Sequence, residues 1–87
     1  MAYAVLFQPA ARRELARLQR VDQKRVVAAF EHLHDNPRPV GCAKLAGFTD
    51  VWRIRVGVFR IVYRIKDRQL IIEVIRIAHR RDVYRGL

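Results

Sequence analysis

The stretch LAGFTDVWRIRVGVFRIVY, residues 45–63, constrains the fold more than any other part of the chain. It predicts two strands joined by a two-residue loop, Gly57-Val58, because a loop with glycine first suits the turns that match the twist of paired strands. Closing the hairpin there places Arg55 opposite Arg60. Side chains alternate along a strand, so one face of the hairpin is expected to carry these two arginines and Arg53. The other face is expected to be apolar and carries Trp52, Ile54, Val56, Phe59, Ile61 and Tyr63.

The three arginines are the first candidate site. Like charges directly across a strand pair destabilise a sheet, so an arginine opposite an arginine indicates that an anion binds there. Arginine presents a planar fork of donors that matches phosphate oxygens, and it keeps its charge at any relevant pH. The alternative is a solvent-exposed strand face, which is the commonest fate of alternating charged residues. Arg64 and Lys66, further along the same side, are expected to be solvated.

The overall charge supports an anionic partner. The formal net charge is +10 and the pI is near 11.3. Residues 1–43 carry seven Lys and Arg against four Asp and Glu, whereas residues 44–87 carry eleven against four. The positive charge is therefore concentrated in the half that contains the hairpin. Nucleic acid, a ribosome surface and an acidic protein are the natural partners, and a merely solvated basic surface is the alternative.

Cysteine usage and hydropathy bear on the compartment. The single cysteine, Cys42, excludes an internal disulfide and fits a reducing cytosol. No apolar run approaches the roughly 20 residues that span a bilayer. The N-terminus has its positive charge after its apolar run, which is the wrong order for a signal peptide. We expect a cytoplasmic protein without membrane contact, with residues 1–87 forming one domain.

The first half of the chain predicts one strand and two helices. Residues 3–7 are aromatic and β-branched, as in a strand, and Pro9 suits the first position of a helix. Apolar residues then recur at helical spacing at Ala11, Leu15 and Leu18. Asp22 is the expected N-cap of a second helix, which Asp35-Asn36-Pro37 ends. Its apolar stripe comprises Val26, Val27, Phe30 and Leu33.

The second half predicts a loop and a last strand around the hairpin. Residues 37–50 contain two prolines and two glycines, as expected of a loop, and Asp67-Arg68 suits a second tight turn. The last strand, Leu70–Ala78, is apolar on both faces, as in a central strand covered on both sides. One face would hold Leu70, Ile72 and Val74, and the other Ile71, Ile75 and Ile77. The β-α-α-β-β-β order predicts an α+β fold: a two-helix hairpin packed on a curled, mostly antiparallel, four-stranded sheet.

Further candidate residues follow the last strand, whose neighbour carries Arg60. Catalytic groups usually lie where strands end, and His79 can exchange protons near neutral pH. Tyr84 can stack on a base or pass a proton. The alternatives, of equal weight, are an exposed histidine and a tyrosine that covers the edge of the core.

The sequence predicts no metal or cofactor. His32 and His34 stand two positions apart on a helix, so they do not share a face and cannot chelate together. The eight carboxylates are scattered, without the spacing of a zinc or two-metal site. Any phosphate chemistry is therefore expected to run without metal.

The segments AYAVLFQPAARRELARL, KLAG, WRIRVGVFRIVYRI and AHRRDVY, in this order of elements, resemble the RelE/ParE superfamily of bacterial and archaeal type II toxins. The resemblance covers nearly the whole chain and is to the RelE branch. It implies an enzyme that enters the ribosomal A site and cleaves mRNA by attack of a ribose 2′-OH on the adjacent phosphate. It also implies a cognate antitoxin, contacts with 16S-type rRNA, and operator DNA bound only through the antitoxin complex.

Carried over by position, the resemblance assigns roles to particular residues. Arginines would hold phosphate and stabilise charge in the transition state, and Tyr84 would stack or assist proton transfer. The residues that match by position are Arg53, Arg55, Arg60, Arg80 and Tyr84. With His79 added from its place after the last strand, the expected catalytic set is Arg60, His79, Arg80 and Tyr84. With the basic residues Lys44 and Arg81 added, the set expected to bind RNA phosphate is Lys44, Arg53, Arg55 and Arg81.

The chain departs from the family pattern in two places. Some members carry lysines where Arg53 and Arg55 stand, and a guanidinium cannot replace a lysine as general base because it does not lose its proton. The base is therefore expected to be His79 or Tyr84, or proton transfer is left partly to the ribosome. Val58-Phe59 stands where relatives often have an acidic residue and a tyrosine.

Two other functions fit the same scaffold. The ParE branch inhibits DNA gyrase and lacks the nuclease residues, so the presence of Arg60, Arg80 and Tyr84 together favours the nuclease. Fold alone does not decide between them. The other alternative is a basic module that binds RNA or antitoxin without catalysis.

Overall fold

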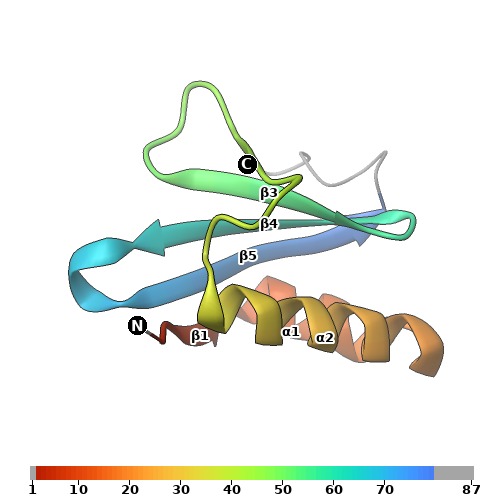
Figure 1. The fold of residues 1–87 in the computed structure, drawn as a ribbon. Coiled ribbons are helices and arrows are strands. Elements are labelled where there is room, and N and C mark those ends of the chain that lie inside the picture. The colour runs from red at the N-terminus through yellow and green to blue at the C-terminus, as the bar shows by residue number, and fades with distance from the viewer. Residues whose placement is uncertain (1, 80–87) are drawn as a thin grey trace.

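The computed structural model describes residues 2–79. In it, two helices lie against one face of a five-stranded sheet of order β1-β5-β4-β3-β2 (Figure 1). β1 runs parallel to β5, and the other neighbours are antiparallel. The predicted α+β class is confirmed. The elements are β1 (Ala4–Phe7), α1 (Pro9–Arg17), α2 (Arg20–Asp35), β2 (Ala43–Lys44), β3 (Val51–Val56), β4 (Phe59–Lys66), the 3-10 turn η1 (Asp67–Gln69) and β5 (Ile71–His79).

The sheet has one strand more than the four predicted. The additional strand is β2, whose two residues pair with Trp52 and Arg53 of β3 inside the segment predicted to be a loop. A strand of two residues has no alternation from which to predict it, and the prolines and glycines around it are typical of a loop.

The β3–β4 hairpin has the predicted register. Trp52 pairs with Tyr63, and Arg55 pairs with Arg60 across the turn. Gly57 has φ 60°, in the left-handed region that glycine adopts without steric cost. Turn chemistry and the alternation of apolar residues agree here, so the register could be predicted from local sequence.

Helix α1 begins at Pro9 as predicted, whereas α2 begins two residues before Asp22, at Arg20. The prediction that Asp22 is the N-cap was wrong because the chain is already helical there. Gln19, with ψ 154°, is the extended residue that precedes the helix. Asp22 lies in the first turn, where a carboxylate still interacts favourably with the helix dipole. Neither helix in residues 2–79 is long and apolar enough to cross a membrane.

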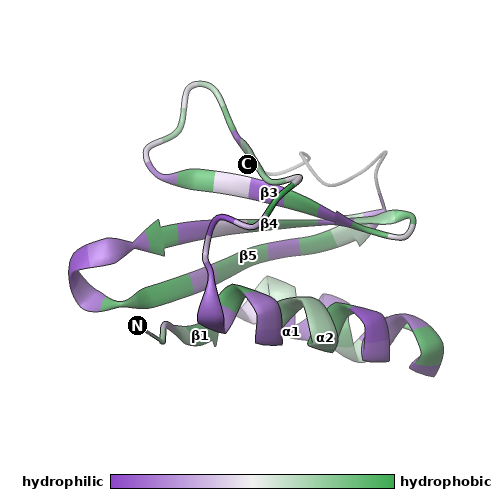
Figure 2. Ribbon diagram, viewed as in Figure 1, coloured by the Kyte–Doolittle hydropathy of each residue, from purple (hydrophilic) through white to green (hydrophobic). Residues whose placement is uncertain are grey.

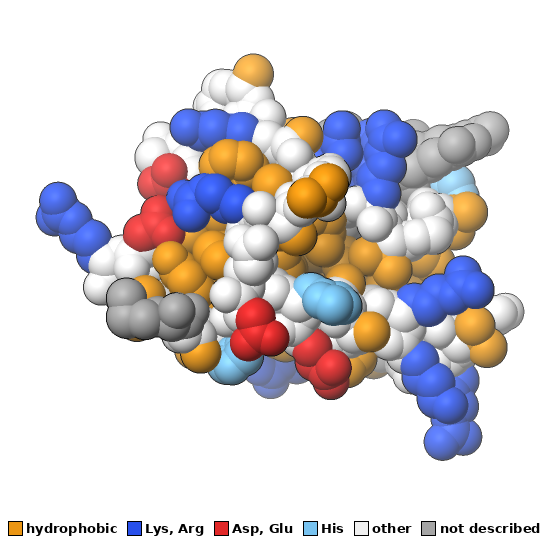
Figure 3. All heavy atoms as spheres, in the orientation of Figure 1, with side chains coloured by type: hydrophobic (Ala, Val, Ile, Leu, Met, Phe, Trp, Pro, Cys, Tyr) orange, Lys and Arg blue, Asp and Glu red, His pale blue; other side chains and the backbone are white. Residues whose placement is uncertain are grey.

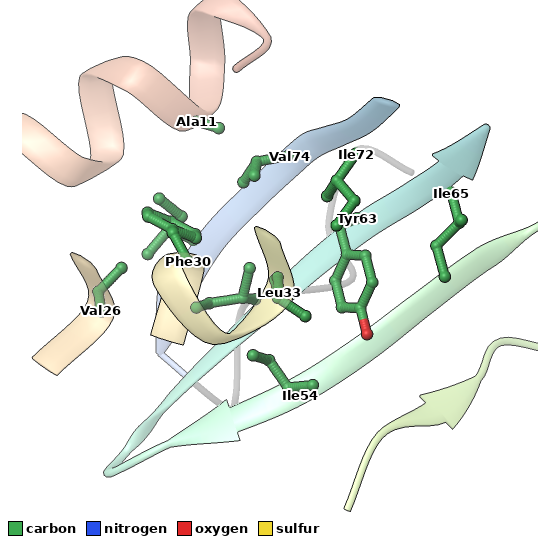
Figure 4. Packing of buried hydrophobic residues seen from close by; sticks show 11 residues of the cluster. Ala11, Val26, Phe30, Leu33, Ile54, Tyr63, Ile65, Ile72 and Val74 are labelled. Carbon is green, nitrogen blue, oxygen red and sulfur yellow. The ribbon is translucent and has the colours of Figure 1, made fainter. Parts of the chain in front are cut away.

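The core lies between α1, α2 and the sheet. Figure 4 shows Phe30 and Leu33 of α2 among the side chains of the sheet. Val27, which was predicted to belong to the same stripe, is 44% exposed. The buried residues of α2 follow i, i+4 and i+7 spacing, and a residue one position after Val26 is turned about 100° away from that line. The buried residues are Ala11, Val26, Phe30, Leu33, Ile54, Ile61, Tyr63, Ile65, Ile72, Val74 and Ile77.

Strand β5 contains a bulge that sequence reasoning did not predict. Val62 pairs with Arg76 and Tyr63 pairs with Val74, so Ile75 is the extra residue on β5. The bulge turns Ile77 onto the helix side, where it joins the core, although alternation had placed it on the opposite face. Figure 2 shows hydrophobic residues along most of β5. Alternation cannot reveal a bulge in a strand that is apolar on both faces.

The start of β5 also differs from the prediction. Leu70 was expected on the strand, but it ends η1 in the left-handed conformation with φ 53°, and β5 begins at Ile71. The strand is nevertheless interior, as predicted, because it lies between β1 and β4.

An ion pair ties the loop after α2 to the turn between β4 and β5. Arg38 Nη1 and Nη2 donate to Asp67 Oδ1 and Oδ2 at 3.2 and 2.8 Å, and Tyr3 Oη donates to Asp67 Oδ1 at 2.8 Å. The Arg38 guanidinium also lies 5.2 Å from the ring centre of Trp52. Hydrogen bonds from Arg38 and then Tyr3 hold the pKa of Asp67 below its usual range.

We expect Asp67→Asn to lower the free energy of unfolding at neutral pH. The folded-state pKa of Asp67 is depressed. The stabilisation is therefore present above the unfolded-state pKa of about 3.9 and is lost as the pH falls through the folded value. Urea denaturation of parent and variant should give a stability difference that shrinks as the pH is lowered through this range. A difference of the same size in acid would contradict the assignment.

Candidate anion-binding site

Arg53, Arg55 and Arg60 lie on the face of the sheet opposite the helices, which we call the arginine face. Their neighbours along the strands, Ile54 and Ile61, belong to the core beneath the helices. Side chains that alternate with these must point the other way. Arg55 is exposed, and Arg53 and Arg60 are half-buried. The structure therefore brings together the three residues that the hairpin pattern predicted.

The arginine face has an apolar floor. Val51 and Val62 are buried there and pack with the partly buried side chains of Leu45, Ile75 and Ala78. A charge over an apolar surface is less well solvated than one in open water, so it interacts more strongly with an opposite charge.

Carboxylates neutralise some arginines of the chain but not all of them. Arg64, on the same face, lies 3.4 Å from Glu73, which pairs with it across β4 and β5. Within residues 2–79, neither Arg53 nor Arg55 forms an ion pair. Within the described part of the chain, the positive charge at the hairpin end of β3 is therefore not neutralised by a carboxylate. Figure 3 shows Lys and Arg side chains gathered in this region, separate from a second group near the start of α2.

A cleft of about 560 Å³ runs beside this charge. Arg53, Ile54, Arg55 and Val56 form one wall, and residues of α2 and of the loop 39–41 form the others. β2 pairs only with residues 52 and 53, so the edge of β3 beyond them is open in the described part of the chain. The remaining lining residues of the cleft are Ala29, His32, Pro39, Val40 and Gly41.

The other predicted residues are not brought together with these arginines. Ala78, and not His79, pairs with Arg60. His79 pairs with Phe59 on the side of the sheet that the helices cover. The centres of the two rings lie 6.4 Å apart, in an edge-to-face arrangement. Lys44 pairs with Trp52 at the β2 edge, which by register also puts it on the helix side. Arg80, Arg81 and Tyr84 lie outside the described residues.

Groups that hold metals are not assembled in the described residues. No three His, Cys, Asp or Glu side chains in residues 2–79 lie close enough together to hold an ion. His34 forms a hydrogen bond instead, with Nδ1 2.6 Å from the carbonyl oxygen of Tyr3.

Sequence reasoning missed the ion pair between Glu14 of α1 and Arg76 of β5. Arg76 Nε and Nη2 donate to Glu14 Oε2 at 3.0 and 2.9 Å. The backbone N–H of Ile77 donates to Glu14 Oε1 at 2.9 Å. These partners stand more than 60 positions apart, so no local pattern links them. The only local signal was a lone carboxylate on an α1 that is otherwise rich in arginine.

Comparison with known proteins agrees with this fold. The family model for the ParE toxin of type II toxin-antitoxin systems matches residues 5–84. The chain is 35% identical over 86 residues to Toxin RelG of Mycobacterium tuberculosis, spanning 98% of this chain and 99% of the relative. It is 36% identical over 88 residues to a putative RelE-like toxin protein of Escherichia coli, spanning 97% and 92% respectively.

Solved structures show the same architecture. The RelBE2 toxin-antitoxin complex of Mycobacterium tuberculosis contains a chain of 30% identity that superposes with a TM-score of 0.80, covering 92% of this chain and all of that one. A chain of the archaeal RelE-RelB complex from Pyrococcus horikoshii, at 24% identity, superposes with a TM-score of 0.82 over 92% of this chain and 97% of that one. The matched family model and relatives span nearly the whole sequence, so the chain belongs to the RelE/ParE superfamily of type II toxins.

Proposed function

We propose that this toxin is a RelE-type endoribonuclease that cleaves mRNA in the ribosomal A site. The observation that carries the proposal is the arginine face, where Arg55 stands opposite Arg60 above an apolar floor. The matched relatives support it, because their names are Toxin RelG and RelE-like toxin. Such an enzyme would act in the cytoplasm, where ribosomes and mRNA meet.

The reaction needs positive charge around one phosphate. The ribose 2′-oxygen forms a bond to phosphorus while the bond to the 5′-oxygen breaks, which leaves a cyclic phosphate and a 5′-hydroxyl. Arg53 and Arg55 would hold the RNA backbone. Arg60, with Arg80, would stabilise the negative charge that develops on the phosphate oxygens. The 2′ proton passes to a base, and the leaving oxygen takes a proton from an acid.

We further propose that a cognate antitoxin inhibits the toxin. Several solved relatives are toxin-antitoxin complexes of RelE with RelB. A basic toxin of net charge +10 suits a partner with an acidic surface. Operator DNA would be bound only through that complex.

Primer extension on a defined mRNA, with and without programmed ribosomes, tests the proposed activity. We expect cuts within codons that appear only when ribosomes are present. Cuts in free RNA would contradict the ribosome requirement. A protein that halts growth without any cuts would contradict the nuclease, and one that neither cuts nor halts growth would be a binding module.

Inhibition of DNA gyrase is the second candidate function, because the family model that matches the chain is that of the ParE toxin. A gyrase supercoiling assay with purified toxin separates the two functions. Gyrase inhibition is expected to survive the loss of Arg60, whereas mRNA cleavage is not.

The identity of the base can be tested at two positions. His79 lies beside Phe59 on the helix side, which favours Tyr84 as the group that transfers the proton. We expect Tyr84→Phe to lower the single-turnover rate about 100-fold, and His79→Ala to stay within about threefold of the parent. The measurement is the single-turnover rate of cleavage at saturating ribosomes, recorded as a function of pH. A folded His79→Ala that is inactive would reverse the assignment.

A further inference from the structure

The bulge in β5 determines which side chain stands beside Arg60. In the observed register Arg60 pairs with Ala78, and Phe59 pairs with His79. If Ile75 were not bulged, every residue after it would move by one position along β4. Ile77 would then lie opposite Arg60, with a branched side chain in place of a methyl group. A shift of one residue also moves each side chain to the other face of the sheet.

The bulge is held from outside the sheet. Bulged residues leave the ladder locally disrupted, so nearby backbone groups need other partners. The Ile77 N–H has such a partner in Glu14 Oε1 at 2.9 Å. Arg76 binds the same carboxylate and keeps it in place, with Nη2 2.9 Å from Oε2. Both side chains are about four-fifths buried, so solvent screens this pair less than it would an exposed one.

We propose that Glu14 is a positioning residue for mRNA cleavage. It holds the bulged register of β5, and through that register it keeps the small Ala78 beside Arg60, which leaves room for a phosphate on the arginine face. Glu14 does not touch the RNA. This inference rests on the proposed endoribonuclease activity and adds to it a residue on α1, far from the reacting groups in sequence.

Two substitutions of Glu14 distinguish the effect of the β5 register from the effect of the carboxylate charge. Glu14→Leu removes the acceptor for the Ile77 N–H, whereas Glu14→Gln keeps a carbonyl oxygen that can accept the same hydrogen bond. We expect Glu14→Leu to lower the single-turnover rate at saturating programmed ribosomes by about tenfold to a hundredfold. The ribosome concentration at half-maximal rate should change by less than about twofold, because the loss is in alignment and not in binding. Glu14→Gln should restore most of the rate.

Two further variants provide controls. Asp67→Asn weakens another arginine–carboxylate pair, at the opposite end of β5, and is expected to cleave at the parental rate although it is less stable. Ala78→Ile leaves Glu14 in place but puts a branched side chain beside Arg60, and it should lose activity as Glu14→Leu does. Amide hydrogen exchange reports on the register of β5 in the absence of ribosomes. The Ile77 amide should exchange about tenfold faster in Glu14→Leu, and at the parental rate in Asp67→Asn.

Three outcomes would overturn the proposal. The first is a Glu14→Leu variant with rapid Ile77 exchange that still cleaves at the parental rate. The second is a loss of rate in Glu14→Leu, Glu14→Gln and Asp67→Asn that follows the loss of stability of each variant, which would make the role structural only. The third is an Ala78→Ile variant with parental activity. A parent protein that does not cleave would overturn the proposed function, and this role with it, even if the exchange data still showed that Glu14 holds the bulge.

Discussion

Arg60→Ala is expected to lower the single-turnover rate of mRNA cleavage by about a hundredfold to a thousandfold, as is typical when one charge-stabilising donor is removed from a reaction centre. Arg60 is half-buried, and its Nε is shielded from solvent. A guanidinium that is already placed where charge develops needs no reorganisation during the reaction. The loss should therefore fall on the rate at saturating ribosomes.

The matched control is Arg64→Ala on the same strand and the same face. Arg64 is neutralised by Glu73 at 3.4 Å and lies four residues from Arg60, toward the other end of the sheet. We expect its substitution to change the cleavage rate by less than about threefold, because Glu73 already neutralises the charge of Arg64. Equal losses in the two variants would indicate that net charge matters and that the position of Arg60 does not.

Leu33→Ala is expected to lower the free energy of unfolding by about 2–5 kcal/mol, the usual cost of emptying a fully buried leucine site. Leu33 is 0% exposed and packs between α2 and the sheet. A small domain has about 5–15 kcal/mol of stability in total, so this one change would remove much of it. Urea denaturation measures the effect.

Val27→Ala is the control on the same helix. Its side chain is 44% exposed, so we expect a loss of less than about 1 kcal/mol. A loss as large as that of Leu33→Ala would mean that Val27 is covered in solution by some other part of the protein.

The hairpin and its arginine face could be predicted because their signals are local. A two-residue turn with glycine fixes the pairing, and six alternating apolar residues confirm it from both strands. The two helices could likewise be predicted, from Pro9 and from apolar residues at helical spacing. The start of α2 could not, because it depends on how α2 follows α1.

The position of His79 could not be predicted, since it depends on the bulge. Unbroken alternation from Ile71 would have put His79 on the arginine face, and the extra residue at Ile75 turns it to the helix side. That bulge is held by Glu14, which is distant in sequence. The chain has eighteen Lys and Arg but only eight Asp and Glu, so sequence alone does not reveal which arginines the carboxylates neutralise.

The position of β5 has a consequence for how the toxin is made. β5 follows the other four described strands in the chain, yet it lies in the interior of the sheet and pairs with β1 over Ala4–Phe7. The native sheet cannot close until the C-terminal part of the chain has emerged from the ribosome that makes it. Such non-local pairing is also slow to form. The five-stranded sheet, and with it the arginine face, is therefore completed only after β5 has left the ribosome.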